Sequence, residues 1–190
     1  CPNIKKGGIV FGTVPEVAHR LTKACAEVTD VPIVVKLTPN VSDVVAMAQA
    51  VSEAGAMGVS LINTITGMAI DVRKRRSRIA TTYGGLSGPA IKPVALRMVH
   101  QVHRALPELP ICGMGGIMSG EDVVEYFMAG ASTVQVGTAN FAEPAAALRI
   151  TEETRALLGE LGFDSPAAAV GALETLAPEP EWQEVSPHDG

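Results

Sequence analysis

The sequence contains few aromatic residues, few cysteines and no excess of positive charge, and each shortage excludes a class of protein. Phe, Trp and Tyr make up 4% of the 190 residues, so the core is expected to be aliphatic, as in α/β proteins. Cys1, Cys25 and Cys112 are an odd number of cysteines at wide spacing, which argues against a disulfide framework or a zinc site. The net charge of −5 argues against binding to nucleic acid or to an anionic membrane, which are themselves negatively charged.

The sequence also lacks a hydrophobic run long enough to cross a membrane, and no signal peptide is recognisable in it. Together with the cysteine pattern, this predicts a cytoplasmic protein that binds no metal, no membrane and no nucleic acid. Because the chain starts with Cys-Pro-Asn rather than with Met, residue 1 is not expected to be the biological start. One basic run, residues 73–78, is interpreted as a solvated loop.

An alternation of strand and helix patterns is present instead. Four short segments predict buried strands, of which residues 31–37 are a continuous apolar run, and each is followed by apolar residues at helical spacing. The expected strands are residues 31–37, 58–63, 110–114 and 133–137. Alternating βα units imply a parallel sheet with right-handed crossovers. We therefore predict an α/β fold in which the chain supplies four βα units, about the second half of a TIM (β/α)8 barrel; a small doubly wound sheet is the alternative. The first half of the barrel is expected in residues ahead of Cys1.

Two further segments fall outside this alternation. Residues 64–88 form a polar excursion that is too long for an ordinary βα connection, and loops of such length are usually functional or disordered. Residues 177–190 contain three prolines and several acidic residues, which predicts a disordered tail after a domain of residues 1–176.

Small residues end the last two predicted strands. Gly115 and Gly116 follow one strand, and Gly137 and Thr138 follow the next. Without bulky side chains the backbone N–H groups are bare, and bare N–H groups bind phosphate. Two such ends, about 20 residues apart, occupy the place where TIM barrels commonly bind phosphate. This pair therefore predicts a phosphate site.

Other strand ends carry groups suited to catalysis. Lys36 lies within an apolar strand, where it is either a salt-bridged core lysine or a cation facing a bound anion. Asn63 ends a buried strand, either as a cap on the backbone or as a ligand for a polar substrate. Cys1 lies in a loop at the predicted active face, where a thiol can be a nucleophile or a proton acceptor.

These residues belong to motifs that resemble the dihydroorotate dehydrogenase family, and most of all its class 1B catalytic subunit. The resemblance covers about residues 1–160, and the motifs occur in the family order. They are Cys1-Pro-Asn3, Val35-Lys-Leu-Thr-Pro-Asn40, Ile62-Asn-Thr64, Gly67-Met-Ala-Ile-Asp71, Gly84-Gly-Leu-Ser-Gly-Pro-Ala-Ile-Lys-Pro93, Gly113-Met-Gly-Gly116 and Val136-Gly-Thr-Ala-Asn140.

The resemblance implies an FMN-dependent barrel that oxidises dihydroorotate to orotate in pyrimidine (UMP) biosynthesis. It implies that Cys1 is the catalytic base, and that Asn3, Asn63 and Thr64 bind the substrate. The positions that match FMN-binding residues are Lys36, Ile62, Ser87, Gly88, Gly115, Gly116, Gly137 and Thr138. The physics agrees, because a thiol can be tuned to remove a proton beside a carbonyl, and a lysine can stabilise negative charge on a reduced flavin.

The resemblance further implies that electrons pass from FMN to a partner subunit carrying FAD and a 2Fe–2S cluster, and then to NAD. A homodimer of catalytic subunits within a heterotetramer is expected. A second enzyme interpretation is a pyrimidine reductase domain like that of dihydropyrimidine dehydrogenase, which Thr81-Thr-Tyr-Gly-Gly85 resembles. A non-enzymatic interpretation is a phosphate-binding half-barrel that serves as an assembly module.

Overall fold

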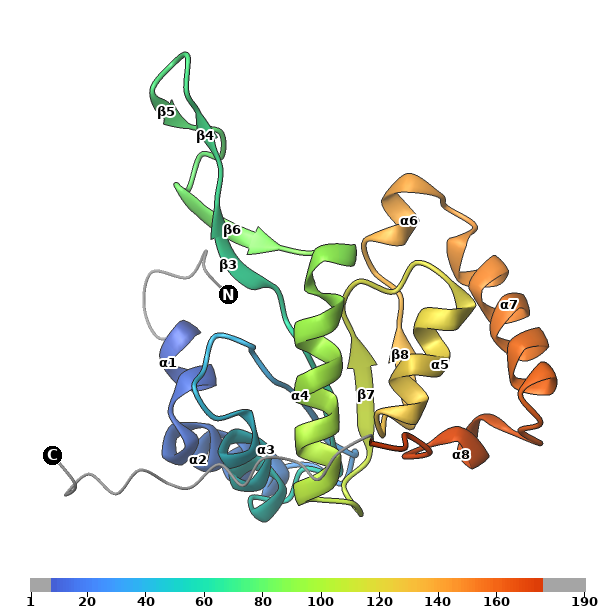
Figure 1. The fold of residues 1–190 in the computed structure, drawn as a ribbon. Coiled ribbons are helices and arrows are strands. Elements are labelled where there is room, and N and C mark those ends of the chain that lie inside the picture. Colours follow the sequence, from blue (N-terminus) through green and yellow to red (C-terminus); the bar gives the residue numbers. More distant parts are fainter. Residues whose placement is uncertain (1–7, 176–190) are drawn as a thin grey trace, which may run out of the picture.

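The computed structural model describes residues 8–175, and its centre is a four-stranded parallel sheet. The strands are β1 (Val34–Lys36), β2 (Gly58–Leu61), β7 (Ile111–Met114) and β8 (Thr133–Gln135). They lie side by side in the order β1-β2-β7-β8, which is also their order in the chain. Figure 1 labels β7 and β8, which are neighbours in this sheet. This confirms the predicted parallel arrangement of βα units. The strands are shorter than the apolar runs; the run over residues 31–37 forms a strand of three residues only.

Helices follow the strands as the apolar periodicity predicts. The described helices are α1 (Gly8–Thr13), α2 (Pro15–Ala26), α3 (Val44–Glu53), the 3₁₀ helix η1 (Pro89–Ile91), α4 (Lys92–Ala105), α5 (Gly120–Met128), α6 (Ala139–Ala142), α7 (Ala146–Glu160) and α8 (Pro166–Ala169). Side-chain caps fix three of the starts: Asp43 accepts a hydrogen bond from the Ala46 N–H, Ser119 forms a capping box with Asp122, and Ser165 accepts from the Ala168 N–H. None of the described helices is long and apolar enough to cross a membrane.

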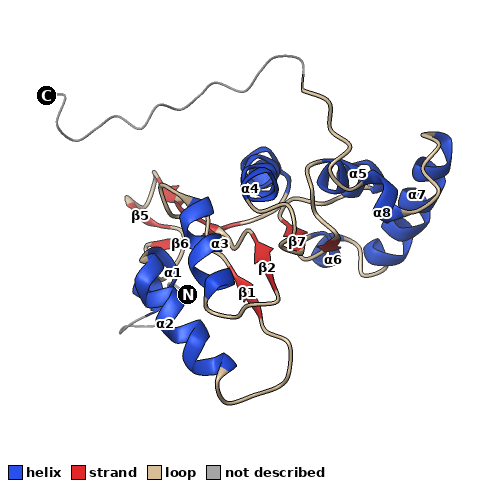
Figure 2. Cartoon of the chain, turned by 90° about the horizontal axis from the view of Figure 1, so that it is seen from below, coloured by secondary structure: helices blue, strands red, loops and turns tan. Residues whose placement is uncertain are grey.

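The two faces of the sheet differ in chemistry. Side chains alternate between the faces of a strand, so the paired register separates two sets. Val59, Leu61 and Ile111 are almost fully buried on the face that packs against helices. On the opposite face, Lys36 pairs with Ser60, Ser60 with Cys112, and Cys112 with Thr133, a row of small or polar side chains. Figure 2 shows α3 and α4 on one side of the sheet.

A doubly wound sheet carries helices on both faces, whereas a barrel carries them on the outer face only. In the part of the chain that the structure describes, the polar row on the other face is not covered by a helix, which favours the barrel over the doubly wound alternative. The structure differs here from the prediction that residues 31–37 form a buried strand. Val34, on the same face as Lys36, is 52% exposed among the described residues.

The long excursion between β2 and α4 forms an arm that projects away from the sheet (Figure 1). It consists of two antiparallel ribbons, which pair β3 (Ile65–Met68) with β6 (Tyr83–Leu86) and β4 (Ile70–Asp71) with β5 (Arg76–Ser77). The basic run lies near its tip, and Lys74 lies 3.7 Å from the carboxylate of Asp71. The excursion is therefore an ordered ribbon and not the irregular loop that its polar composition suggests.

Candidate functional site

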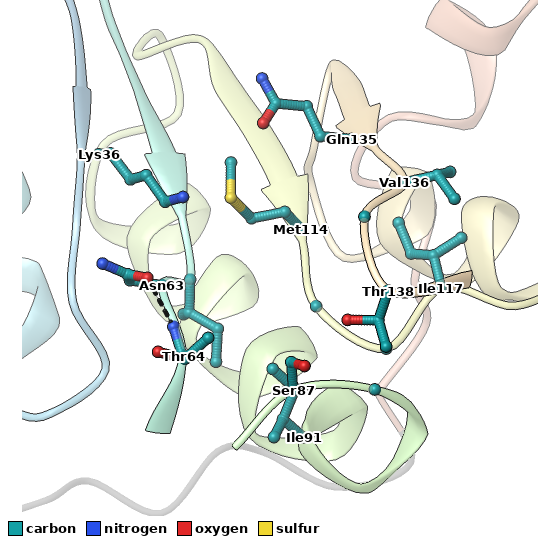
Figure 3. Close-up of a pocket in the computed structure, with 15 residues that line it drawn as sticks. Lys36, Asn63, Thr64, Ser87, Ile91, Met114, Ile117, Gln135, Val136 and Thr138 are labelled. Carbon is teal, nitrogen blue, oxygen red and sulfur yellow. Dashed lines mark hydrogen bonds between the residues drawn. The ribbon is translucent and has the colours of Figure 1, made fainter. Parts of the chain in front are cut away.

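A pocket of about 210 Å³ lies where the carboxyl ends of the four parallel strands meet. Ten residues that the sequence selects as substrate or cofactor ligands all line it. They are Lys36, Ile62, Asn63, Thr64, Ser87, Gly88, Gly115, Gly116, Gly137 and Thr138. Figure 3 shows Lys36, Asn63 and Thr64 on one side, Ser87 below, and Thr138 across the pocket. Segments up to a hundred residues apart in the chain thus converge on one cavity.

The turn after β7 is built so that only glycine fits it. Gly115 and Gly116 have φ angles of 129° and 75°, in the left-handed region that other residues rarely adopt. A Cβ atom on Gly116 would lie 2.9 Å from the carbonyl oxygen of Gly88 and 2.9 Å from Cβ of Lys92. The backbone of this turn therefore approaches both the Gly88 loop and α4 closely, and no side chain shields it from the pocket.

The backbone N–H groups of this turn are available to a ligand. Among the described residues, none accepts a hydrogen bond from the N–H of Gly115, Gly116 or Ile117. The same holds for the N–H groups of Gly137 and Thr138, on the next strand end. Ile117 is buried and Gly115 and Gly116 are half-buried, where N–H groups are nearly always paired, so their unpaired donors beside one cavity indicate an anion-binding site. Gly137 and Thr138 are exposed and line the same cavity.

Lys36 brings the positive charge to this pocket. It ends β1 on the sheet face opposite the helices, and its side chain is exposed rather than buried. Among the described carboxylates none forms an ion pair with it. Within the part of the chain that the structure describes, Lys36 thus has no salt-bridge partner, and its role as a cation that faces a bound anion stays a prediction. The ammonium group is free to face an anion in the pocket.

Asn63 and Thr64 follow β2 and form one wall of the pocket. The Asn63 Oδ1 atom accepts a hydrogen bond of 2.8 Å from the Thr64 N–H, so the side chain does cap the backbone. Its Nδ2 group makes no hydrogen bond to another described residue. Capping and ligand binding are thus compatible here, because the cap uses the acceptor of the amide and leaves the donor.

Asn40 positions this wall and was not selected from the sequence. Its Nδ2 group donates to the Thr64 carbonyl at 3.1 Å, and its Oδ1 atom accepts from the Thr66 N–H at 2.9 Å. The Asn40 side-chain amide thus hydrogen-bonds to one backbone carbonyl and one backbone N–H, as the backbone of a neighbouring strand would. These bonds join the loop after β1 to the base of the arm. The Nδ2 group also donates to Thr38 Oγ1 at 2.9 Å.

An ion pair behind the glycine turn holds the loop that leads into α5. The Lys92 ammonium group lies 2.5 Å from Asp122 Oδ1, while Asp122 Oδ2 accepts from the N–H groups of Met118 and Ser119. Burial alone would raise the pKa of Asp122, but Lys92 and the two N–H donors outweigh it and hold that pKa below its usual range. Burial alone would likewise lower the pKa of Lys92, but the carboxylates of Asp122 and Glu125 keep it raised.

Replacing Asp122 with asparagine is expected to lower the free energy of unfolding by about 1–3 kcal/mol at pH 7, because a buried charged hydrogen-bond acceptor is lost. A depressed carboxyl pKa stabilises the fold above the unfolded-state value, near 3.9, and this contribution is lost as pH falls through the folded-state pKa. The difference between variant and wild type should therefore shrink below about pH 4. Urea unfolding of the full natural protein at several pH values measures it.

Asp43→Asn is the matched control, since asparagine caps a helix about as well as aspartate. It should change stability by less than about 0.5 kcal/mol. Equal losses for the two variants, or a loss for Asp122→Asn that does not depend on pH, would contradict a stabilising role for the Asp122 charge.

Two predicted site residues lie outside the part of the chain that the structure describes, and several residues that line the pocket were not predicted from the sequence. Cys1 and Asn3, the predicted base and substrate ligand, lie outside the described residues, as does the predicted tail. Five further residues line the pocket without having been selected: Ile91, Met114, Ile117, Gln135 and Val136. Gln135 could have been found, because it is a polar residue in an apolar strand two positions before Gly137. Residues 8–175 contain no cluster of His, Cys, Asp and Glu that could hold a metal ion.

Comparison with known proteins gives one consistent result. Residues 1–158 match the family model described as dihydroorotate dehydrogenase. The chain is 58% identical over 171 residues to the dihydroorotate dehydrogenase B (NAD(+)) catalytic subunit of Anoxybacillus flavithermus, covering 90% of the chain and 54% of the relative. It is 55% identical over 174 residues to the subunit of the same name from Geobacter sulfurreducens, covering 92% of the chain and 57% of the relative. The chain thus spans about half the length of the curated relatives it matches.

Proposed function

Because this chain belongs to the dihydroorotate dehydrogenase family, we propose that the full natural protein oxidises dihydroorotate to orotate with bound FMN, in pyrimidine biosynthesis. The observation that supports this most is the convergence of ten motif residues on one pocket at the strand ends. A scaffold module would need unpaired N–H donors, but it would not need a free lysine and a free amide donor beside them. The assembly-module interpretation is therefore not favoured.

The phosphate of FMN fits the donors of this pocket. The unpaired N–H groups of Gly115, Gly116, Gly137 and Thr138 surround one cavity, and a phosphate presents several acceptor oxygens to such donors. The close approach of the Gly116 backbone to Gly88 leaves no room for a side chain that could shield them. Ile62, Ser87 and Gly88 line the same pocket and are proposed to contact the cofactor.

Lys36 is proposed to stabilise the charge of the reduced cofactor. When FMN is bound, it supplies the acceptor for the hydride that leaves the substrate, and its ring gains electron density. The Lys36 ammonium faces the pocket and no described carboxylate neutralises it. A free, preorganised cation at this place can lower the energy of the reduced state.

The substrate is proposed to bind through Asn3, Asn63 and Thr64, and Cys1 is proposed to take the proton. Asn63 keeps a free donor for a carboxylate or carbonyl oxygen, while Asn40 holds Thr64 and the base of the arm in place. Directional hydrogen bonds of this kind would orient a planar ring for proton removal on one side. The thiol suits this task because its pKa can be tuned toward working pH.

The relatives' names include NAD(+) and the words catalytic subunit. We propose on this basis that electrons leave toward NAD through a partner subunit with FAD and a 2Fe–2S cluster. A homodimer of catalytic subunits within a heterotetramer, located in the cytoplasm, completes the proposal. Pull-down of the tagged full natural protein from its own cells, followed by analysis of bound flavin and iron, tests the partner.

The activity is tested with the full natural protein. We expect a yellow protein with a flavin spectrum that dihydroorotate bleaches in the absence of oxygen. Uracil and thymine should not reoxidise the reduced protein, whereas a dihydropyrimidine dehydrogenase-like reductase would use them as acceptors. A colourless protein that neither binds FMN nor consumes dihydroorotate would contradict the proposal.

Replacing Lys36 with alanine is expected to slow reduction of the flavin by dihydroorotate by about 10²-fold, because one preorganised charge beside the cofactor is lost. Stopped-flow absorbance of the full natural protein measures this rate. Lys23→Ala is the control, since Lys23 is an exposed lysine on α2 that does not line the pocket. Normal flavin affinity together with a normal reduction rate in Lys36→Ala would reject the role.

A further inference from the structure

We propose that Tyr126 is a positioning residue for the phosphate site: its hydroxyl group fixes the Gly115–Gly116 peptide so that the N–H of Gly116 faces the pocket. This inference rests on the proposed function only where it takes the ligand to be the phosphate of FMN. Tyr126 itself does not line the pocket; it contacts Gly115, which does.

The hydroxyl group of Tyr126 reaches the turn from behind. Tyr126 lies on α5 and is fully buried, and its hydroxyl donates a hydrogen bond of 2.7 Å to the Gly115 carbonyl oxygen. In a trans peptide the carbonyl and the next N–H point in opposite directions. Because the Gly115 carbonyl is held toward α5, the Gly116 N–H points away from α5, and Gly116 lines the pocket.

The strand before the turn makes room for this contact. Gly113 lies in β7, and a Cβ atom there would meet the ring of Tyr126, with Cε1 at 3.0 Å. The ring therefore occupies the space that a side chain at position 113 would fill, and its hydroxyl reaches the carbonyl just after the strand end. Gly113 thus makes room for the ring of Tyr126, and it does not itself line the pocket.

The turn needs a hydrogen bond from outside because glycine does not restrict its own backbone conformation. Gly115 and Gly116 both adopt positive φ angles, and glycine reaches several alternative conformations at little cost. No described residue accepts a hydrogen bond from the N–H groups of Gly115, Gly116 and Ile117, so these donors do not fix the turn themselves. Among the described residues, the Tyr126 hydroxyl is the group that donates a hydrogen bond to the carbonyl oxygen of this peptide.

The chemistry of the site keeps the hydroxyl as a donor. Burial raises the pKa of Tyr126, and the negative charges of Asp122 and Glu125 raise it further. The phenol therefore stays protonated throughout the working pH range and always donates. The ion pair of Lys92 with Asp122 holds the following residues, Met118 and Ser119, so both ends of the loop are fixed.

The test is Tyr126→Phe in the full natural protein, with binding of FMN and of riboflavin compared in the apoprotein. Riboflavin lacks the phosphate, so it reports the rest of the site. We expect the dissociation constant for FMN to rise about five- to tenfold, the value of one hydrogen bond, and the constant for riboflavin to change less than twofold. Tyr83→Phe is the matched control, because Tyr83, the other tyrosine of the chain, is exposed on the arm.

Equal losses for FMN and riboflavin would mean that Tyr126 supports the fold in general, and would overturn the proposal, as would unchanged FMN binding. If the wild-type protein binds no FMN, the proposed function fails, and inorganic phosphate then serves as the probe. A rise in melting temperature on adding phosphate that Tyr126→Phe abolishes supports the role of Tyr126 independently of flavin. No such rise in the wild type, or the same rise in both proteins, overturns it.

Discussion

Replacing Cys1 with serine in the full natural protein is expected to lower kcat for dihydroorotate oxidation at pH 7 by about 10²- to 10⁴-fold, while FMN stays bound. General-base catalysis contributes a factor of this size, and a serine hydroxyl is too weak an acid to ionise near neutral pH. A thiol ionises near pH 8.5 in model compounds, so the serine variant should regain activity only at higher pH than the wild type. Steady-state kinetics from pH 6 to 10 and the flavin absorbance measure both effects.

The chain offers a matched control for this substitution. Cys25 is an exposed thiol on α2 and does not line the pocket, so Cys25→Ser should retain full turnover. Because Cys1 lies outside the described residues, its role depends on the family motif and on this experiment. A Cys1→Ser variant with wild-type kcat at pH 7 would remove the thiol from the mechanism, whatever its effect on KM.

Replacing Gly116 with alanine is expected to weaken FMN binding by at least about 10²-fold, so that the protein purifies largely without flavin. The new Cβ atom would lie 2.9 Å from the Gly88 carbonyl oxygen and 3.0 Å from the Lys92 backbone nitrogen. Neither of these is a flexible side chain, and the φ angle of 75° is itself unfavourable for alanine by about 1–2 kcal/mol. The turn must therefore move, and the N–H donors of the phosphate site move with it. Flavin titration of the apoprotein measures the loss.

Gly159→Ala is the control for a generic effect of replacing glycine. Gly159 lies on α7, and a Cβ atom there meets nothing within 4 Å. Alanine favours a helix more than glycine does, so this variant should bind FMN normally and be as stable as the wild type or more so. Equal FMN affinity in Gly116→Ala and the wild type would show that the turn does not hold the phosphate.

The fold and the membership of the pocket could be predicted from sequence for a clear physical reason. Short, mostly apolar segments such as 58–63 and 110–114 indicate buried strands, and the rule that parallel strands share one end places the residues at their ends together. Lys36, Asn63, Gly115 and Gly137 each follow or end such a run, and all four line one cavity. The family match agrees, so the prediction of part of a TIM barrel is confirmed.

What sequence could not give depends on contacts between distant residues. The apolar neighbours of Lys36 predict burial, but only the sheet order reveals that its face is uncovered by the described helices. Asn40 pairs with a backbone 24–26 residues away, and the Tyr126 hydroxyl on α5 donates to a carbonyl 11 residues back, at the start of the loop that precedes this helix. Neither contact leaves a periodic signal in the sequence, because each depends on how two elements pack.

The arm gives the molecule a marked separation of charge. Residues 65–86 carry five cationic side chains and one acidic one, a net charge of +4, while the whole chain carries −5, which leaves −9 for the remaining residues. The base of this arm adjoins the pocket through Thr64 and Ser87. The cationic run 73–78 lies near the tip of the arm, so an approaching anion is attracted to the arm and repelled by the acidic side chains in excess elsewhere on the chain. Its association rate should fall as salt rises, since the Debye length shortens to about 8 Å at physiological ionic strength.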